Sequence, residues 1–165
     1  MNIFDPSTFT GFHTDLSVIA LISGFVVVIG MLASRRLAFW TMLFLATAVL
    51  TDVTGYGFKT SGILPSQILG AISLVVLLAA ILALYVYGLA GSWRWIYTTS
   101  GVATLYFLVF VAITQAFAKV PSLHALAPTQ SEPPFAIAQL VALAIFILLG
   151  IAAARLFRTK AAVFA

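Results

Sequence analysis

Residues 66–90 read SQILGAISLVVLLAAILALYVYGLA, a run without a single charged side chain. A helix needs about 20 predominantly apolar residues to cross the hydrocarbon core of a bilayer, so this run predicts a transmembrane helix. Four further apolar runs lie on either side of it, at residues 16–33, 37–53, 95–118 and 135–157. The predicted fold is therefore all-α: one integral membrane bundle of five transmembrane helices that covers residues 1–165 as a single domain.

Composition supports a membrane environment. Of the 165 residues, 63% are hydrophobic and 7% are charged, whereas roughly a quarter of the residues are charged in an ordinary soluble domain. The lipid bilayer is therefore the first expected partner. The net charge of +4 comes from residues at the ends of the runs, which favours lipid headgroups and gives no support to nucleic-acid binding. The absence of cysteine excludes disulfide scaffolds, thiolate metal sites and covalent haem attachment.

The run at residues 37–53 is the shortest. Its strictly apolar part ends before Thr51, so it can cross only if Thr51 and Asp52 enter the membrane with it. A re-entrant hairpin is the alternative. That arrangement would place Arg35 and Arg36 on the same side as Lys59, which weakens the charge asymmetry, and five full crossings are therefore preferred.

Charged residues are sorted between the two sides of the membrane. With the N-terminus outside, six basic residues face the cytoplasm and two lie outside. This is the arrangement that the positive-inside rule favours, so we expect the N-terminus outside and the C-terminus in the cytoplasm. All four acids then belong to the outer side. The cytoplasmic basic residues are Arg35, Arg36, Arg94, Arg155, Arg158 and Lys160, the outer ones Lys59 and Lys119, and the acids Asp5, Asp15, Asp52 and Glu132.

Asp52 is the most informative of the acids. It follows Arg36 by sixteen residues and so lies about 24 Å above the basic ring, inside the membrane, and Gln139 reaches the same height above Arg155. A buried acid costs about 2.5–3.5 kcal/mol at the centre of the bilayer, which favours a functional role. The interpretation is an outward-opening polar pocket. Its candidate ligand-binding residues are Asp52, Gln139, Gln67, Gln115, Thr51, His13 and Asp15.

Two structural explanations compete with this pocket. Asp52 can simply mark the point where the helix leaves the membrane, because Gly55 and Gly57 follow it. Threonines in membrane helices commonly bond their own backbone carbonyls, which would explain Thr51. His13, Asp15 and His124 offer metal or haem ligands, but their spacing matches no metal motif, so no metal site is predicted. No catalytic constellation occurs within one segment, so no catalytic residue is proposed.

The loop at residues 119–134 carries two local signals. Residues 121–127, PSLHALA, predict one or two interfacial helical turns. Ser131 is the expected cap of the last helix, with Glu132 and two prolines in its first turn.

Three phrases, LTDVTGYGF at 50–58, QAFAKVPSL at 115–123 and APTQSEPPF at 127–135, together with the plan of spans, resemble small bacterial inner-membrane proteins described only as membrane proteins. The resemblance covers most of the chain. It implies a multi-pass protein of the bacterial cytoplasmic membrane and implies no particular chemistry or site residues.

Three functions remain open from the sequence. The leading one is a protein without catalytic activity: an accessory or assembly subunit of a membrane complex, or a binder of lipid or a small ligand in a periplasm-facing pocket. The second is a component of a membrane oxidoreductase that binds quinone or haem. The third is a small transporter subunit, alone or as an oligomer of itself, although no inverted repeat is evident.

Overall fold

A computed structural model describes residues 7–58 and 65–158, and no β-strand occurs among them. Its long helices are the α-helices predicted from the apolar runs, and the third is extended by a π-helical turn, η1. All five resulting segments are long and apolar enough to cross a membrane. The elements are α1 (Phe9–Leu32), α2 (Ala38–Gly55), α3 (Pro65–Ile81), η1 (Leu82–Val86), α4 (Trp93–Lys119), the short α5 (Pro121–Leu126) and α6 (Pro133–Leu156).

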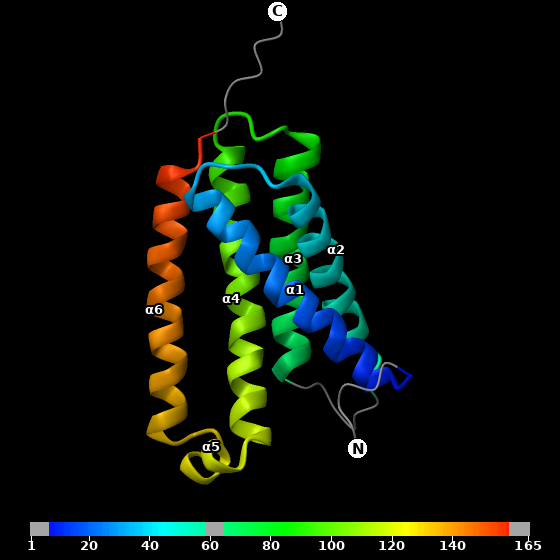
Figure 1. Ribbon diagram of the computed structural model, residues 1–165, viewed down its shortest axis with the longest axis vertical. Coiled ribbons are helices and arrows are strands. Elements are labelled where there is room, and N and C mark those ends of the chain that lie inside the picture. Colours follow the sequence, from blue (N-terminus) through cyan, green and yellow to red (C-terminus); the bar gives the residue numbers. More distant parts are fainter. Residues whose placement is uncertain (1–6, 59–64, 159–165) are drawn as a thin grey trace, which may run out of the picture.

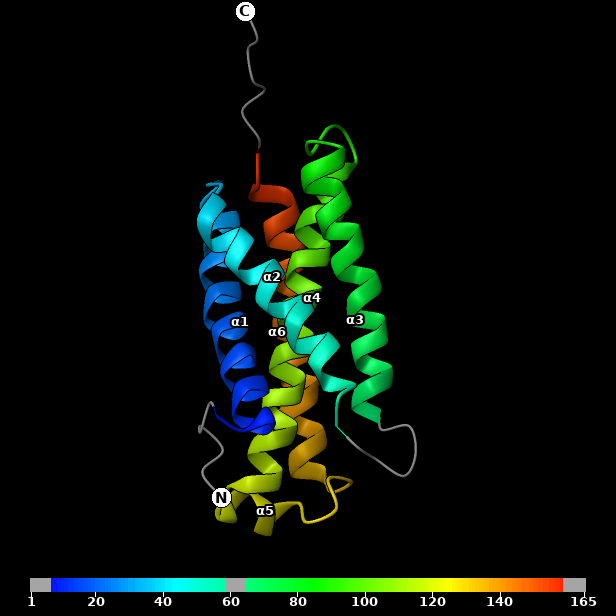
Figure 2. The same ribbon diagram turned by 90° about the vertical axis from the view of Figure 1, so that its right-hand side faces the viewer.

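The helices run up and down in one bundle around α4 (Figure 1). Helix α4 packs against α1, α3 and α6, while α2 packs against α1 and α3. Figure 2, turned by 90°, shows α2 crossing the bundle obliquely between α1 and α3. Helix α2 is a single continuous helix of 18 residues, about 27 Å long. It therefore has the length of a full crossing. These residues form one helix and not the alternative re-entrant hairpin.

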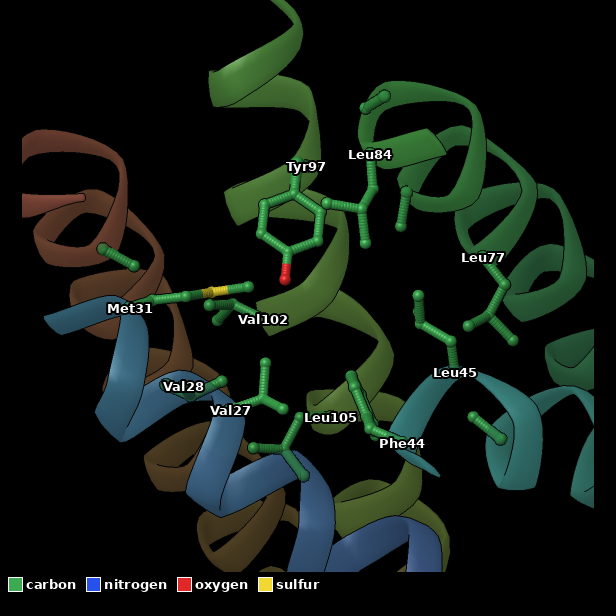
Figure 3. Packing of buried hydrophobic residues seen from close by; sticks show 14 of the residues in the cluster. Val27, Val28, Met31, Phe44, Leu45, Leu77, Leu84, Tyr97, Val102 and Leu105 are labelled. Carbon is green, nitrogen blue, oxygen red and sulfur yellow. The ribbon is translucent and has the colours of Figure 1, made fainter. Parts of the chain in front are cut away.

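The hydrophobic core takes side chains from all five long helices, including Phe146 and Ala153 of α6. Val27 and Met31 of α1, Phe44 of α2, Leu77 of α3 and Leu105 of α4 are each at most 3% exposed. Figure 3 shows these side chains pointing toward one another between the helices. The opposite helix faces carry exposed aliphatic and aromatic side chains, as expected for surfaces that contact lipid tails.

Helix α1 comes unusually close to α2 and α4. A Cβ atom placed on Gly24 would lie 2.7 Å from Leu105 Cδ1 and 2.7 Å from Phe44 Cε2. A Cβ on Gly101 of α4 would lie 2.9 Å from Met31 Cε of α1. Small residues let membrane helices pack closely, and these two glycines therefore set the separation of α1 from its neighbours.

The charged ends of the bundle differ. The turn at residues 33–37, the α3–α4 connection and the end of α6 meet at one end, which we call the basic end (Figure 1). There the Ser34 hydroxyl accepts a hydrogen bond from the Arg158 N–H (2.8 Å) and donates one to its carbonyl (3.1 Å). Arg94 Nη1 donates to the Phe157 carbonyl (3.0 Å), so the α1–α2 turn, the start of α4 and the end of α6 are tied together.

The opposite end, which we call the acidic end, carries α5, the starts of α1, α3 and α6, and the ends of α2 and α4. Asp15, Asp52 and Glu132 lie in this half, whereas the described arginines Arg35, Arg36, Arg94, Arg155 and Arg158 lie at the basic end. The predicted sorting of charge thus holds for the described residues. Asp5, Lys59 and Lys160 lie outside them.

Several helix ends differ from the predicted boundaries. Helix α1 begins at Phe9, seven residues earlier than the apolar run, because Thr8 caps it: its Oγ1 accepts a hydrogen bond from the Gly11 N–H (3.0 Å). The third span ends at Val86, before the expected Ala90. Positive φ angles at Gly88 (+56°) and Leu89 (+63°) turn the chain there.

The start of α6 also differs from the expectation that Ser131 caps it. The capping residue is Glu132, and no side chain caps the helix. The Glu132 carboxylate instead accepts hydrogen bonds from the Thr129 hydroxyl (2.9 Å) and the Ser131 N–H (3.1 Å). Slight desolvation raises the pKa of Glu132, but these hydrogen bonds outweigh it and hold the pKa below its usual value. The predicted interfacial turns at residues 121–127 are present as α5.

Candidate functional site

A groove of about 300 Å³ runs between α3 and α4 at the acidic end. We call it the acidic-end groove. Its volume is at the lower limit of typical small-molecule sites. It is lined by Ser66, Ile68, Leu69 and Ile72 of α3 and by Phe110, Val111, Thr114 and Gln115 of α4.

The groove is apolar along its walls, and its polar residues lie toward the acidic end of the bundle. Ser66 lies in the first turn of α3, and Thr114 and Gln115 lie near the end of α4. The Gln115 side chain is exposed, and no hydrogen bond to it is found in the described part of the chain. A groove of this kind suits an amphipathic molecule, whose apolar part contacts the walls while its polar group reaches the amide and hydroxyl groups.

Gln139 connects α6 to the wall of this groove. Its Nε2 donates hydrogen bonds to the Phe110 carbonyl (3.1 Å) and to Thr114 Oγ1 (3.3 Å). The Thr114 hydroxyl donates in turn to the Phe110 carbonyl (2.9 Å). Gln139 is only 8% exposed, and its Oε1 atom is buried without a hydrogen-bond partner. Gln139 therefore positions the groove residue Thr114 but does not line the groove.

Asp52 lies between α2 and α3. Ser73 of α3 makes a side-chain hydrogen bond to its carboxylate. The Oδ2 atom of this carboxylate is buried and has no partner, and the same is true of Oγ1 of the neighbouring Thr51. Buried polar atoms in folded proteins are nearly always paired with protein groups or ordered water. The half-buried Asp52 thus turns one carboxylate oxygen into the protein interior. This unpaired oxygen offers an acceptor to a water molecule or a ligand.

These interior polar groups lie below the acidic-end groove. Ser73 follows Ser66 by seven residues on α3, and Thr104 precedes Val111 by seven on α4, so each lies two turns deeper on the same helix face. Two turns correspond to about 10 Å. Thr104 is fully buried, and its hydroxyl has no partner either. Counted at 1.5 Å per residue from the basic end, Asp52 lies at about 21 Å, Ser73 at about 20 Å and Thr104 at about 17 Å, so the three share a layer.

His13 contacts α2 at a different place. Its Nδ1 lies 2.8 Å from Thr54 Oγ1. The Thr54 hydroxyl also lies 2.7 Å from the Leu50 carbonyl. The His13 tautomer with its hydrogen on Nδ1 lets the hydroxyl accept from His13 while it donates to that carbonyl. The histidine ring also packs edge-on against Phe58 at 5.1 Å. His13 therefore joins the ends of α1 and α2 and does not line the groove.

The sequence-predicted site residues are therefore divided among several places. Gln115 lines the groove, Gln139 supports it, and Thr51 and Asp52 belong to the layer beneath it. Gln67 lies on α3 beside Ser66, and its carbonyl accepts a hydrogen bond from the Tyr56 hydroxyl (2.7 Å). His13 and the half-buried Asp15 lie on α1, which contributes nothing to the groove.

In residues 7–58 and 65–158, no three His, Cys, Asp or Glu side chains gather where they could hold a metal ion.

The site also contains residues that were not among the predicted ones. Ser66 and Thr114 line the groove, and Ser73 and Thr104 form the layer below it. Single serines and threonines are common in membrane helices and give no signal by themselves. The pairing of α3 with α4 identifies Ser66 and Thr114. The contact with Asp52 of α2 identifies Ser73, and burial without a partner identifies Thr104.

Comparisons with protein-family models, with curated proteins and with solved structures find no match to this chain. The residues of the groove and of the layer beneath it are therefore the basis for a functional proposal.

Proposed function

We propose that this chain is a membrane protein without catalytic activity that binds a lipid or another small amphipathic molecule in the acidic-end groove. The observation that carries the proposal is the groove itself, with apolar walls from α3 and α4 and the polar groups of Ser66, Thr114 and Gln115. Its volume of about 300 Å³ accommodates a headgroup or a ring with part of a tail. The interior layer at Asp52, with unpaired acceptors, supplies further polar contacts below.

Filling the groove is expected to displace the ligand. Leu69→Trp places a large ring between α3 and α4 and fills part of the groove. We expect ligand retention to fall about tenfold, because the ligand keeps only the contacts that the ring leaves free. Ile147→Trp is the matched control, since Ile147 lies on α6, away from the groove, and is 53% exposed. The protein is purified from its native membrane, and bound molecules are extracted with solvent and quantified by mass spectrometry. Equal retention by both variants would place the ligand elsewhere or show that none is bound.

Quinone is a second candidate ligand. Phe110 provides an aromatic wall, and the Gln115 amide can donate to a quinone carbonyl. In that case the chain would serve a membrane oxidoreductase as its quinone-binding component. The same solvent extract identifies a quinone directly, and mass spectrometry of the copurified proteins identifies the complex to which the chain belongs. A visible absorption spectrum of the same sample tests for haem.

We further propose that the chain resides in the bacterial cytoplasmic membrane with its basic end in the cytoplasm. Five described arginines lie at that end, and all three described acids lie in the other half. The groove then opens toward the periplasm.

Reporter fusions test this orientation. We expect fusions after Ser34, after Ser92 and at the C-terminus to read cytoplasmic, and fusions after Ser61 and Thr129 to read periplasmic, because basic flanks stay in the cytoplasm. Ser61 and the C-terminus lie outside the described residues. Paired alkaline phosphatase and fluorescent-protein fusions at each site provide the readout. A periplasmic C-terminus would reverse the orientation.

A further inference from the structure

A second groove lies at the opposite end of the bundle, between α4 and α6. It has a volume of about 310 Å³ and is lined by Trp95, Thr99, Gly150, Ile151, Ala154 and Arg155. We call it the basic-end groove. It shares no residue with the acidic-end groove, so an inference about it does not depend on the function proposed above.

Arg155 is the charged residue of this groove. Its side chain is exposed, and no hydrogen bond or ion pair to its guanidinium is found within the described residues. No described acid lies at this end of the bundle, so Arg155 has no carboxylate nearby to neutralise it. The neighbouring Arg94 is already engaged, because its Nη1 donates to the Phe157 carbonyl (3.0 Å). The groove therefore presents one available guanidinium beside an apolar wall.

The rest of the groove is suited to a hydrocarbon chain. Gly150 leaves the α6 wall open, since a Cβ placed there would meet only Val102 Cγ1, at 3.8 Å. Ile151 and Ala154 continue the apolar surface, and Trp95 is half exposed at the level of Arg155. Tryptophan and arginine at a helix end are typical of the membrane–water interface. Guanidinium groups bind phosphate oxygens through short, charge-assisted hydrogen bonds.

We propose that the basic-end groove binds one anionic phospholipid. The phosphate group of the lipid contacts the Arg155 guanidinium, and one acyl chain lies against Gly150 and Ile151. Charge complementarity decides the occupant: the only charge that lines the groove is positive, and the remaining described charges at this end of the bundle are positive too.

Native mass spectrometry of the delipidated full chain tests the proposal with two probes of identical acyl chains, dioleoyl phosphatidylglycerol and dioleoyl phosphatidylcholine. We expect one phosphatidylglycerol to bind at least tenfold more tightly than phosphatidylcholine. Arg155→Gln should weaken phosphatidylglycerol binding about tenfold. Arg35→Gln is the matched control, because it removes the same charge from the same end at an exposed side chain outside the groove, and it should leave the binding of this lipid within twofold of the parent.

Gly150→Leu is the second variant, and it keeps every charge while filling the apolar part of the groove. It should also weaken phosphatidylglycerol binding about tenfold, and circular dichroism verifies that each variant is folded. Equal binding of the two lipids by the parent would overturn the proposal. Equal losses in Arg155→Gln and Arg35→Gln would also overturn it, by showing attraction to the whole basic end. Unchanged binding in Gly150→Leu would exclude the groove as the site.

Discussion

Replacing Gly24 with leucine is expected to destabilise the bundle by about 3 kcal/mol. The added side chain would meet Leu105 Cδ1 and Phe44 Cε2, each already 2.7 Å from the position of a Cβ. Both are core side chains with 0% of their surface exposed, so they have no free space to move into. The gain in helix propensity from glycine to leucine, under about 1 kcal/mol, offsets only part of this cost.

The measurement is the unfolding transition of the purified protein in mixed detergent, followed by circular dichroism. Gly150→Leu serves as the control, because it makes the same substitution within a helix where the nearest atom is 3.8 Å from the added Cβ. We expect this control to unfold close to the parent. Coincident transitions for the two variants would show that α1 can move away from α2 and α4 without loss.

Asp52→Asn is expected to preserve the fold and to lower ligand retention about ten- to hundredfold. Asparagine keeps the shape of the side chain and an oxygen that can accept the hydrogen bond from Ser73. It replaces the second carboxylate oxygen, the unpaired Oδ2 atom, by an NH₂ group. The acceptor that Asp52 offers to a ligand or a water molecule thereby becomes a donor. Hydrogen bonds to charged groups contribute about 1.5–3 kcal/mol. The loss of one such bond therefore corresponds to an affinity about ten- to hundredfold lower.

Two further variants interpret this result. Asp15→Asn removes an acid from α1 that belongs neither to the groove nor to the layer beneath it, and it should retain ligand like the parent. Asp52→Leu removes the link to Ser73 as well as the charge and should also lose the ligand. Thermal unfolding in detergent is measured beside ligand retention. If Asp52→Asn and Asp52→Leu both match the parent in stability and retention, Asp52 has no role in binding.

Some features of the candidate site were predictable from particular residues. The count of residues from Arg36 placed Asp52 inside the membrane, because a helix has a fixed rise and the basic ring fixes one end. In the structure Asp52 lies in the last turn of α2, where its carboxylate contacts Ser73 of α3. The count from Arg155 likewise placed Gln139 deep, but depth does not say which neighbour a side chain faces. Gln139 faces α4, where it bonds Phe110 and Thr114.

His13 shows the limit of such reasoning. The sequence groups it with Asp52, because His13 comes just before the first predicted span and Asp52 at the end of the second, which places both at the same side of the membrane. The structure pairs His13 with Thr54 across α1 and α2, while Asp52 turns toward α3. Asp52 and Thr54 lie on nearly opposite faces of α2, since two residues along a helix are separated by about 200°. Which face meets which helix depends on packing between segments distant in sequence.

The sequence by itself determined that the chain is helical, that it has five apolar segments of spanning length, and that its charges are sorted between two ends. These properties are local, because they follow from runs of about 20 residues and from the charges that flank them. Only the tertiary structure decided that α4 is central, that Gly24 packs against Phe44 of α2 and Leu105 of α4, and that the groove forms between α3 and α4. All five helices are apolar around most of their circumference, so hydrophobicity alone does not select partners, and close packing and a few buried hydrogen bonds do.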